Sequence, residues 1–544
     1  MAAPNPDVQR YMRAAGDAMR MGDMAAACRI GGEAVSRGIE NEQLLTLAAY
    51  ARLDAGDNAN ALVFALRARG LAPRSIDVLA ALATCFSRNG RLREAVDVYD
   101  AALKLSPGTT RLRFDKACVL ENMSEVGRAM REFERVLDSE PRNAEALSHL
   151  ANLAVLGGDA KSARDFAERA LKSDPRQTAA KLALANADVE DKKFEDAVAR
   201  LKPLIAEAGL GLVNRSIAQG LMADALDGLG RADEAFRTYA ASKTSLQTNF
   251  RPQYEVAGAE TAHARVVRLE QYFRAAPEEV WRARKSETSD SPVRTHVFLV
   301  GFPRSGTTLL EQILASHRDI VAMEERDCLI DAAEEFLMAP DSLDRLAKLQ
   351  GEELAGFRDA YWRRVDEAGV KPSRPVFVDK MPLNAVLLCL VAKLFPRAKI
   401  LFALRDPRDV VLSCFRRRFG MTAQMYELIT LEGAARYYDA VMRLAQIYRA
   451  KLGLDIHDLH YEAMVADLEK EMRAVCAFLQ IEWDDAMRSF AERARGRSID
   501  TPSAAQVSRG LYTQGAGQWQ RYAAQMAPVM PLLEPWVTQY GYSE

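Results

Sequence analysis

Two patterns of apolar and polar residues divide the chain. In the first half, small apolar residues recur at a constant interval of 34 positions, whereas the second half contains short, continuous apolar runs. These runs lie at 297–300, 375–379 and 398–404, and helix-like sequence separates them. Continuous apolar strands separated by helices are typical of a parallel sheet covered on both faces. The pattern therefore predicts a two-part chain, with an all-α repeat array followed by an α/β domain.

The repeat array is marked by six alanines in register. They stand 34 residues apart, with glycine five positions before several of them and proline twelve positions after, at Ala27, Ala61, Ala95, Ala129, Ala163 and Ala197. Alanine permits two helices to cross closely, glycine forms the turn between them, and proline ends the second helix. This is the tetratricopeptide period. A further unit at Ala235 gives about seven units over residues 8–249.

The repeats predict an architecture without identifying a ligand. Arrays of this kind present a concave surface that binds peptides or proteins. Recruitment of a protein partner or substrate therefore stays open beside a scaffolding role, including formation of a homo-oligomer. Residues 250–293 are predicted to form a bridge, helical from Tyr254 to Ala276, followed by a polar linker at 285–292.

A glycine-bounded loop follows the first apolar run of the second half. Gly301 and Gly306 bracket four residues, and the helix-like sequence LLEQILASH comes soon after. A strand, such a loop and a helix N-terminus together form a common phosphate site. The spacing matches a P-loop, but Thr307 stands where a P-loop has lysine, and Arg304 is the cation within the loop. This composition favours a ligand with less charge at its reacting end than a nucleoside triphosphate.

The sequence GFPRSGTTLLEQILASH at 301–317 resembles the 5′-phosphosulfate loop of sulfotransferases. The resemblance is closest to tyrosylprotein sulfotransferases and to bacterial relatives joined to tetratricopeptide repeats. It implies a P-loop-like sulfotransferase domain over residues 294–544 that uses 3′-phosphoadenosine 5′-phosphosulfate as co-substrate and no metal. The implied contacts to the 5′ end of this donor come from five loop residues, Arg304, Ser305, Gly306, Thr307 and Thr308.

A second motif follows the third apolar run. ALRDPRDVVLSCFRRRF at 403–419 resembles the 3′-phosphate motif of the same family, in which Arg405 and Ser413 would bind the 3′-phosphate. Guanidinium is a bidentate phosphate donor, and a hydroxyl group further along a helix can complete the contacts. The arginines at 416–418 are interpreted instead as a solvated basic stretch.

The acceptor hydroxyl requires a base, and the leaving phosphate requires cations. Glu325 occupies the place of the base in tyrosylprotein sulfotransferases, and His317 is the alternative, because cytosolic sulfotransferases use histidine. By the same resemblance, Lys380 and Arg304 would meet the charge on the leaving group. Asp379 is a competing candidate, as a Mg²⁺ ligand of a nucleoside triphosphatase. Asp327 replaces the arginine with which the family binds acidic peptides.

The C-terminal part resembles a closing segment over the donor. Tyr461 matches a position that stacks near the adenine, and Ser503 would reach the donor from a turn-rich loop. Trp519 falls at the family's spacing, but Gln518 precedes it where the family has lysine. Arg509 is therefore predicted to supply the missing charge.

Composition narrows the class of protein further. The 73 Lys and Arg residues balance 75 Asp and Glu residues, so no nucleic-acid partner is indicated. The seven cysteines form no CxxC pair and have no histidines at metal spacing. No signal peptide is evident, and the longest apolar run, 385–395, is too short to span a membrane. A cytoplasmic location is expected.

The predicted function is transfer of a sulfuryl group from the donor to an acceptor hydroxyl. The acceptor is left open between a protein tyrosine, a sugar and a small molecule, and the repeats are expected to bind a protein partner or substrate. Two alternatives remain. The chain could be an interaction scaffold without activity, or a Mg²⁺-dependent P-loop nucleotide kinase, although the loop lacks the lysine that such a kinase uses.

Overall fold

The computed structural model describes residues 6–123, 125–284, 291–339, 341–491 and 515–542. The chain forms two compact units, residues 1–187 and 188–544, and the boundary between them along the chain falls in helix α11 (Thr178–Glu190). The predicted limits at residues 249 and 293 mark changes in the sequence pattern and stay predictions. The predicted fold class is confirmed, with a helical tetratricopeptide-type region followed by an α/β domain built on a parallel sheet.

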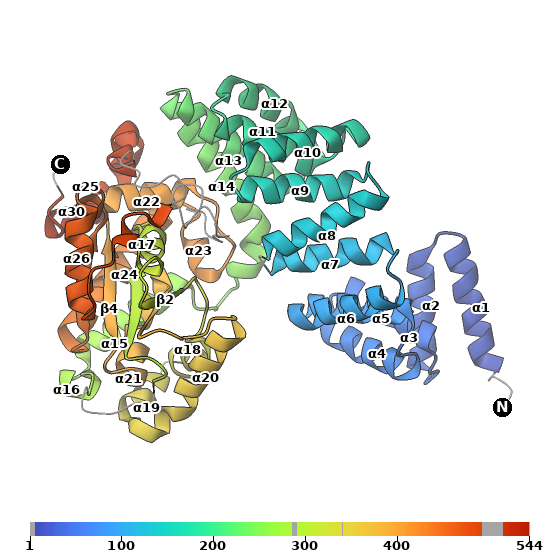
Figure 1. Cartoon of the computed structure of the whole chain (residues 1–544), viewed down its shortest axis with the longest axis horizontal. Helices are drawn as coiled ribbons and strands as arrows, with labels where there is room; N and C mark the ends of the chain where they lie inside the picture. The colour runs from blue at the N-terminus through green and yellow to red at the C-terminus, as the bar shows by residue number, and fades with distance from the viewer. Residues whose placement is uncertain (1–5, 124, 285–290, 340, 492–514, 543–544) are drawn as a thin grey trace. The chain divides into compact units, whose positions relative to one another are not determined.

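The first unit consists of antiparallel helix pairs (Figure 1). The alanines that mark the repeat are completely buried, for example Ala61 and Ala95, because each lies where two helices cross. The turn glycines have φ values of 74–77°, which favour glycine. The helices are α1 (Pro6–Arg20), α2 (Met24–Ser36), α3 (Glu42–Asp54), α4 (Asn58–Leu71), α5 (Ile76–Arg88), α6 (Leu92–Leu105), α7 (Thr110–Asn122), α8 (Val126–Ser139), α9 (Ala144–Leu156) and α10 (Ala160–Ser173).

The second unit begins with further helices of the repeat type. These are α12 (Phe194–Ala206), α13 (Leu212–Gly228) and α14 (Ala232–Tyr254), and α15 (Ala262–Ala275) and α16 (Glu278–Trp281) follow them. The helical stretch predicted from Tyr254 to Ala276 is confirmed for α15, whereas a turn separates this helix from the end of α14 at Tyr254. Gly258 has a φ of 79°, and the Thr261 side chain accepts a hydrogen bond from Ala264 N, so a new helix begins after a turn.

Five parallel strands form the sheet, in the order β2-β3-β1-β4-β5. Their bounds are β1 (Thr295–Gly301), β2 (Ile320–Met323), β3 (Val376–Lys380), β4 (Lys399–Leu404) and β5 (Asp455–His460). β1, β3 and β4 are the three strands predicted from apolar runs. β2 was missed because it has four residues, and β5 because aspartate and histidine interrupt its apolar pattern.

Helices surround this sheet and connect its strands. The longer ones are α17 (Thr307–Ala315), α18 (Ile330–Leu337), α20 (Ala355–Glu367), α22 (Pro407–Arg416), α24 (Leu431–Lys451), α26 (Leu468–Leu479) and α30 (Met530–Gln539). Shorter helical segments are α19 (Ser342–Lys348), η1 (Gly351–Leu354), η2 (Pro382–Leu387), α21 (Leu388–Leu394), α23 (Ala423–Glu427), α25 (Tyr461–Ala466), η3 (Asp485–Met487), η5 (Gln518–Tyr522), α29 (Ala523–Met526) and η6 (Ala527–Val529).

Alternate residues of the strands enter two different cores. Val297 and Leu299 of β1 pack with α17, α25 and α26, whereas Phe298 and Val300 pack with α15, α18, α20 to α22, α24 and α30. The second of these cores also includes Leu226 of α13 and Tyr239 of α14. The last repeat-type hairpin therefore shares a core with the sheet.

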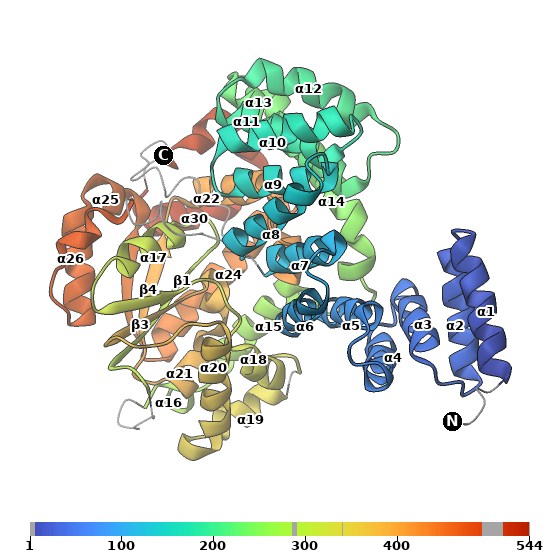
Figure 2. The ribbon, with the colours of Figure 1, turned by 45° about the vertical axis from the view of Figure 1, so that its right-hand side comes forward.

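The central strand carries the glycine-bounded loop. In Figure 2, β1, β3 and β4 lie side by side, and in sequence α17 follows β1 and α22 follows β4. The connection from β1 leads toward β2, whereas that from β4 leads toward β5. Ligands of open α/β sheets bind beyond the carboxyl ends of strands where the connections diverge in this way. The ends of β1 and β4 are thus the expected position of a site.

Gly301 ends β1 where the chain passes very close to β4. A β-carbon at this position would lie 2.6 Å from the carbonyl oxygen of Ala403, and φ is 155°. We expect Gly301→Ala to destabilise the second unit by about 1–3 kcal/mol, because the backbone of β4 would have to shift. Gly356→Ala is the matched control, since a β-carbon there meets nothing within 4 Å.

Tryptophan fluorescence during urea unfolding measures this effect selectively. All five tryptophans belong to the second unit, at Trp281, Trp362, Trp483, Trp519 and Trp536. Equal urea midpoints for the two variants would show that β1 and β4 are not as close at Gly301 as described.

Candidate active site

The loop after β1 has an unusual backbone that only certain residues tolerate. Arg304 has a φ of 74° and Gly306 a φ of 96°. A β-carbon on Gly306 would lie 2.8 Å from Cδ2 of Tyr461, so glycine is required here on two grounds. Gly306 is also the N-cap of α17, whose first-turn N–H groups have no acceptor within the helix. A non-glycine residue in the left-handed region commonly marks a functional site.

The residues predicted to bind the donor come together beside this loop. Arg304 Nε donates to Ser413 Oγ at 3.0 Å, and Arg405 Nη1 donates to the carbonyl oxygen of Arg304 at 3.0 Å. The guanidinium of Arg405 lies 4.9 Å from the centre of the Tyr461 ring. Ser305, Thr307 and Thr308 are buried in the loop and the first turn of α17. The motifs after β1 and β4 thus form one cluster.

This cluster contains an excess of positive charge. Burial, followed by the nearby charges of Arg417 and Arg405, lowers the pKa of Arg304 to about 9. Nε of Arg405 is buried and has no hydrogen-bond partner within the described parts of the chain. An anion beside these groups would relieve the repulsion and provide an acceptor for Arg405 Nε. The cluster is therefore suited to bind phosphate or sulfate groups.

Glu325 and Lys380 form an ion pair at the same edge of the sheet. Lys380 ends β3, and its Nζ donates to Oε1 of Glu325 at 2.9 Å. The lysine side chain is fully buried, whereas that of Glu325 is 39% exposed. Lys380 lies opposite Leu299 of β1, two residues before Gly301. The pair thus combines a solvent-accessible carboxylate with a fixed cation near the loop.

Asp379, the alternative metal ligand, has a different environment. Its side chain is completely buried, and Oδ2 accepts a hydrogen bond of 2.8 Å from the Tyr361 hydroxyl. Burial raises the pKa of Asp379 to about 7. The Tyr361 hydroxyl also lies 2.9 Å from Nε2 of His296, and burial lowers the pKa of that histidine to about 3. A buried carboxyl group in this network is poorly suited to bind Mg²⁺.

His317, the alternative base, is also buried. The Asp319 backbone N–H donates to its Nδ1 at 3.0 Å, so the proton is on Nε2, which donates to the Glu482 carbonyl oxygen at 2.8 Å. Neither ring nitrogen is thus available to an acceptor molecule. This arrangement supports the interpretation of His317 as a packing residue at the end of α17.

The segment from residue 515 to 522 lies against α22. Asp409 accepts hydrogen bonds from Gly517 N at 2.7 Å and from Trp519 N at 2.9 Å. The Arg408 guanidinium lies 4.1 Å from the centre of the Trp519 ring, and Arg405 Nη2 donates to the carbonyl oxygen of Gly515. The predicted donor contacts Ser503 and Arg509 lie outside the described residues, and their roles stay predictions.

Several contributors to the site were not predicted. Asp409 was overlooked because its partners are backbone N–H groups more than 100 residues away. The interpretation of residues 416–418 as a solvated stretch is wrong. The Arg416 side chain is 14% exposed and pairs with Asp227, and burial lowers the pKa of Arg418. Three consecutive arginines so soon after Ser413 were the feature of the sequence that could have indicated a buried, paired cluster.

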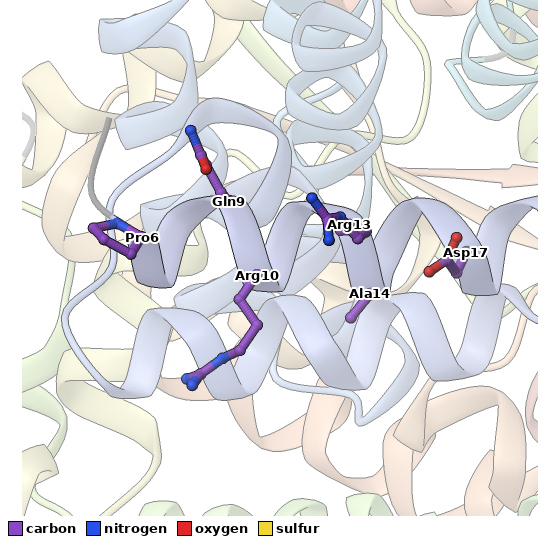
Figure 3. Close-up of a pocket in the computed structure, with 6 residues that line it drawn as sticks. All are labelled: Pro6, Gln9, Arg10, Arg13, Ala14 and Asp17. Atoms are coloured by element: carbon purple, nitrogen blue, oxygen red, sulfur yellow. The ribbon is translucent and has the colours of Figure 1, made fainter. Parts of the chain in front are cut away.

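Other features of the described chain provide no second site. A shallow surface pocket is lined by residues of one helix, α1, namely Pro6, Gln9, Arg10, Arg13, Ala14 and Asp17 (Figure 3). Within the described residues, no three His, Cys, Asp or Glu side chains are grouped as metal ligands. No helix in this part of the chain is both long and apolar enough to cross a bilayer.

Two parts of the chain match models of known families. Residues 296–485 match the family model of the sulfotransferase family, and residues 46–109 and 114–178 match that of the tetratricopeptide repeat. The resemblance to sulfotransferases is confirmed, and the second half of the chain contains a sulfotransferase-family domain.

Individual relatives are distant. A protein of Aquifex aeolicus is 27% identical over 45% of this chain and 33% of its own length. The protein-tyrosine sulfotransferase of Drosophila melanogaster is 24% identical over 55% of this chain and 62% of its own length. The chain thus spans less than two thirds of either relative. The sulfotransferase domain of the Synechococcus PCC 7002 olefin synthase matches with a TM-score of 0.35 and 21% identity, covering 48% of this chain and 99% of that domain.

The buried network of His296 and Asp379 leads to a pH prediction. Between about pH 3.8 and 6.5, the folded chain has neutral His296 and protonated Asp379, whereas the unfolded chain has a charged histidine and a charged aspartate. Both states bind the same number of protons at these two positions. Their contributions to the pH dependence of folding therefore cancel in the wild type.

Replacing one of these two residues reveals the contribution of the other to the pH dependence of the free energy of unfolding. In His296→Phe, Asp379 remains, and the free energy of unfolding should fall relative to wild type by about 1.4 kcal/mol per pH unit as pH rises through this window. In Asp379→Asn it should fall as pH decreases. Urea unfolding followed by tryptophan fluorescence at several pH values measures both slopes. Parallel pH profiles for wild type and both variants would contradict the described burial.

Proposed function

We propose that this chain is a sulfotransferase that moves a sulfuryl group from 3′-phosphoadenosine 5′-phosphosulfate to an acceptor hydroxyl. The observation that carries the proposal is the cluster of Arg304, Arg405 and Ser413 beside a glycine loop at a helix N-terminus. Two arginines on separate strand ends suit a donor with two anionic ends. In this proposal the loop and Arg304 hold the 5′-phosphosulfate, and Arg405 with Ser413 holds the 3′-phosphate.

The ion pair of Glu325 and Lys380 supports a role in the chemical step. Lys380 donates to one oxygen of Glu325, and the exposed part of the carboxylate can take the proton of an acceptor hydroxyl. The acceptor oxygen then attacks sulfur, a sulfur–oxygen bond forms, and the bond between sulfur and the bridging phosphate oxygen breaks. Adenosine 3′,5′-bisphosphate leaves with the bonding electrons, and Lys380 and Arg304 stabilise its new charge.

The acceptor is proposed to be a hydroxyl group outside a strongly acidic context. Asp327 is exposed and lies two residues after Glu325, where acidic neighbours of an acceptor would be repelled. A protein tyrosine, a sugar or a small molecule all remain compatible with this condition. We further propose that the repeats bind a protein partner or the substrate itself and that the protein acts in the cytoplasm.

The competing functions have less support. A Mg²⁺-dependent kinase would use Asp379, whose carboxyl group is buried and bonded to Tyr361. The strained backbone of Arg304 and the buried Lys380 paired with an exposed carboxylate are costly features that are typical of functional sites. An inactive scaffold does not account for them.

The donor assignment predicts selective recognition of the 3′-phosphate. Arg405→Ala should weaken binding of adenosine 3′,5′-bisphosphate by roughly ten- to hundredfold, since a charge-assisted hydrogen bond contributes about 1.5–3 kcal/mol. Binding of adenosine 5′-monophosphate should change much less. Titration calorimetry measures both affinities, with Arg473→Ala, at an exposed ion pair on α26, as control. Equal wild-type affinities for the two nucleotides would overturn the donor assignment.

The catalytic assignment predicts a contrast between two side chains. Glu325→Gln should lower kcat by about 10² to 10⁴, because a general base acts in the transition state, while nucleotide affinity stays near the wild-type value. His317→Ala should lower thermal stability instead, by leaving the Glu482 carbonyl without its donor.

Release of adenosine 3′,5′-bisphosphate during sulfation of a small phenol measures the turnover of both variants. The folded fraction of each is determined first by thermal unfolding. An active Glu325→Gln enzyme together with an inactive, folded His317→Ala enzyme would reverse the assignment.

A further inference from the structure

The last repeat-type hairpin, α13 and α14, is built into the second unit. Its residues Leu226 and Tyr239 belong to the core that also contains Phe298 and Phe402 of the sheet. Phe236 of α14 packs against Phe415 of α22, with ring centres 5.1 Å apart. The hairpin is therefore in direct contact with the helix that carries Ser413.

Asp227 of α13 connects this hairpin to α22 and to η5, two elements beside the proposed donor site. Its carboxylate accepts hydrogen bonds from Arg416 at 2.7 Å, from the Tyr522 hydroxyl at 2.6 Å and from Arg521 at 3.1 Å. Arg416 is the last residue of α22, and the other two belong to η5. One nearly buried carboxylate thus holds the end of α22 and the segment after Trp519 together.

Lys243 of α14 acts on the same end of α22. Its Nζ donates to the carbonyl oxygen of Arg417, the C-cap residue of that helix. Burial lowers the pKa of Lys243 to about 7. The carbonyl groups at a helix end have no partners within the helix, and the amino group of Lys243 supplies one. Lys243 therefore holds the C-terminal end of α22, one turn after Ser413.

Both connections lead to groups in the proposed donor site. Ser413 lies one helical turn before Arg417, whose N–H donates to the Ser413 carbonyl oxygen at 3.1 Å. In η5 and the residues before it, Gly517 and Trp519 are bound to Asp409, and Gly515 accepts from Arg405. A shift of the hairpin would therefore change the positions of Arg405 and Ser413.

We infer that Asp227 and Lys243 are positioning residues of the donor site. The last repeat hairpin thus contributes to the geometry of that site. Neither residue is proposed to touch the donor. Asp227 holds the end of α22 against η5, and Lys243 holds the C-cap residue of α22, one turn after Ser413. The inference rests on the proposed function, because the site that these residues support is the proposed nucleotide site.

The test compares affinities for two nucleotides in the full-length chain. Asp227→Asn and Lys243→Met should each weaken adenosine 3′,5′-bisphosphate by about three- to thirtyfold, the range of couplings carried by residues that do not contact the ligand. Adenosine 5′-monophosphate should be weakened clearly less, since the disturbed groups serve the 3′-phosphate. In the phenol assay, KM for the donor should rise more than kcat falls.

Two further variants separate positioning from general stability. Glu234→Gln removes an exposed pair with Arg231 on the same hairpin and should change neither affinity. Tyr522→Phe keeps the ring but loses one donor to Asp227, so it should show a smaller selective loss even if Asp227→Asn folds poorly.

The outcomes distinguish this inference from the proposed function. Variants that lower the unfolding temperature but leave the ratio of the two nucleotide affinities unchanged would overturn the positioning role. A wild-type protein that does not prefer adenosine 3′,5′-bisphosphate would instead overturn the donor assignment itself. A selective loss of the 3′-phosphate preference in Asp227→Asn or Lys243→Met, and not in Glu234→Gln, supports the inference.

Discussion

Positive charge held out of water at the ends of β1 and β4 is the constraint on which the site depends. Arg304 is half-buried, and Arg405 donates to its carbonyl oxygen; burial, together with the charges of Arg417 and Arg405, holds the pKa of Arg304 well below the ordinary value for arginine. Such an arrangement is unfavourable by itself, and it persists because the surrounding structure holds each group in place. The backbone of Arg304 is fixed by the loop, and Ser413 accepts from its side chain. A bound anion would reduce the repulsion between these arginines, and the free energy gained would add to its affinity.

Burial has a different effect on charge at Asp379, the residue before Lys380 on β3. In the network of His296, Tyr361 and Asp379, burial lowers the pKa of the histidine to about 3 and raises the pKa of the aspartate to about 7. Lys380, the next residue on β3, instead remains paired with an exposed carboxylate. Neighbouring positions on one strand face opposite sides of the sheet, which allows such different environments side by side. The network supports the strand end that presents Lys380.

Sequence patterns predicted the parts of this molecule that local physics determines. The 34-residue period predicted the repeats, and the apolar runs predicted the three central strands, because burial on both faces requires continuous apolar sequence. The loop and the motif after β4 identified Arg304, Arg405 and Ser413, which the structure brings together. Their roles in binding and catalysis remain predictions.

What could not be predicted depends on contacts between distant segments. Asp227 is an ordinary polar position on a repeat helix, and only the fold reveals that Arg416 and Tyr522 converge on it. Likewise, β5 is an edge strand with alternating polar residues, so its pairing with β4 supplies what its composition does not.

The shared core of α13, α14 and the sheet has a consequence for the modularity of this protein. The polar linker around residues 285–290 resembles a natural boundary between exchangeable domains, yet the compact unit begins near residue 188. A recombination event at the linker would separate the sheet from Leu226 and Tyr239, and α22 from Asp227. Any exchange of repeat arrays that preserved this unit would have to occur upstream of α12. An exchange there would leave the last hairpin joined to the sheet whose core it shares.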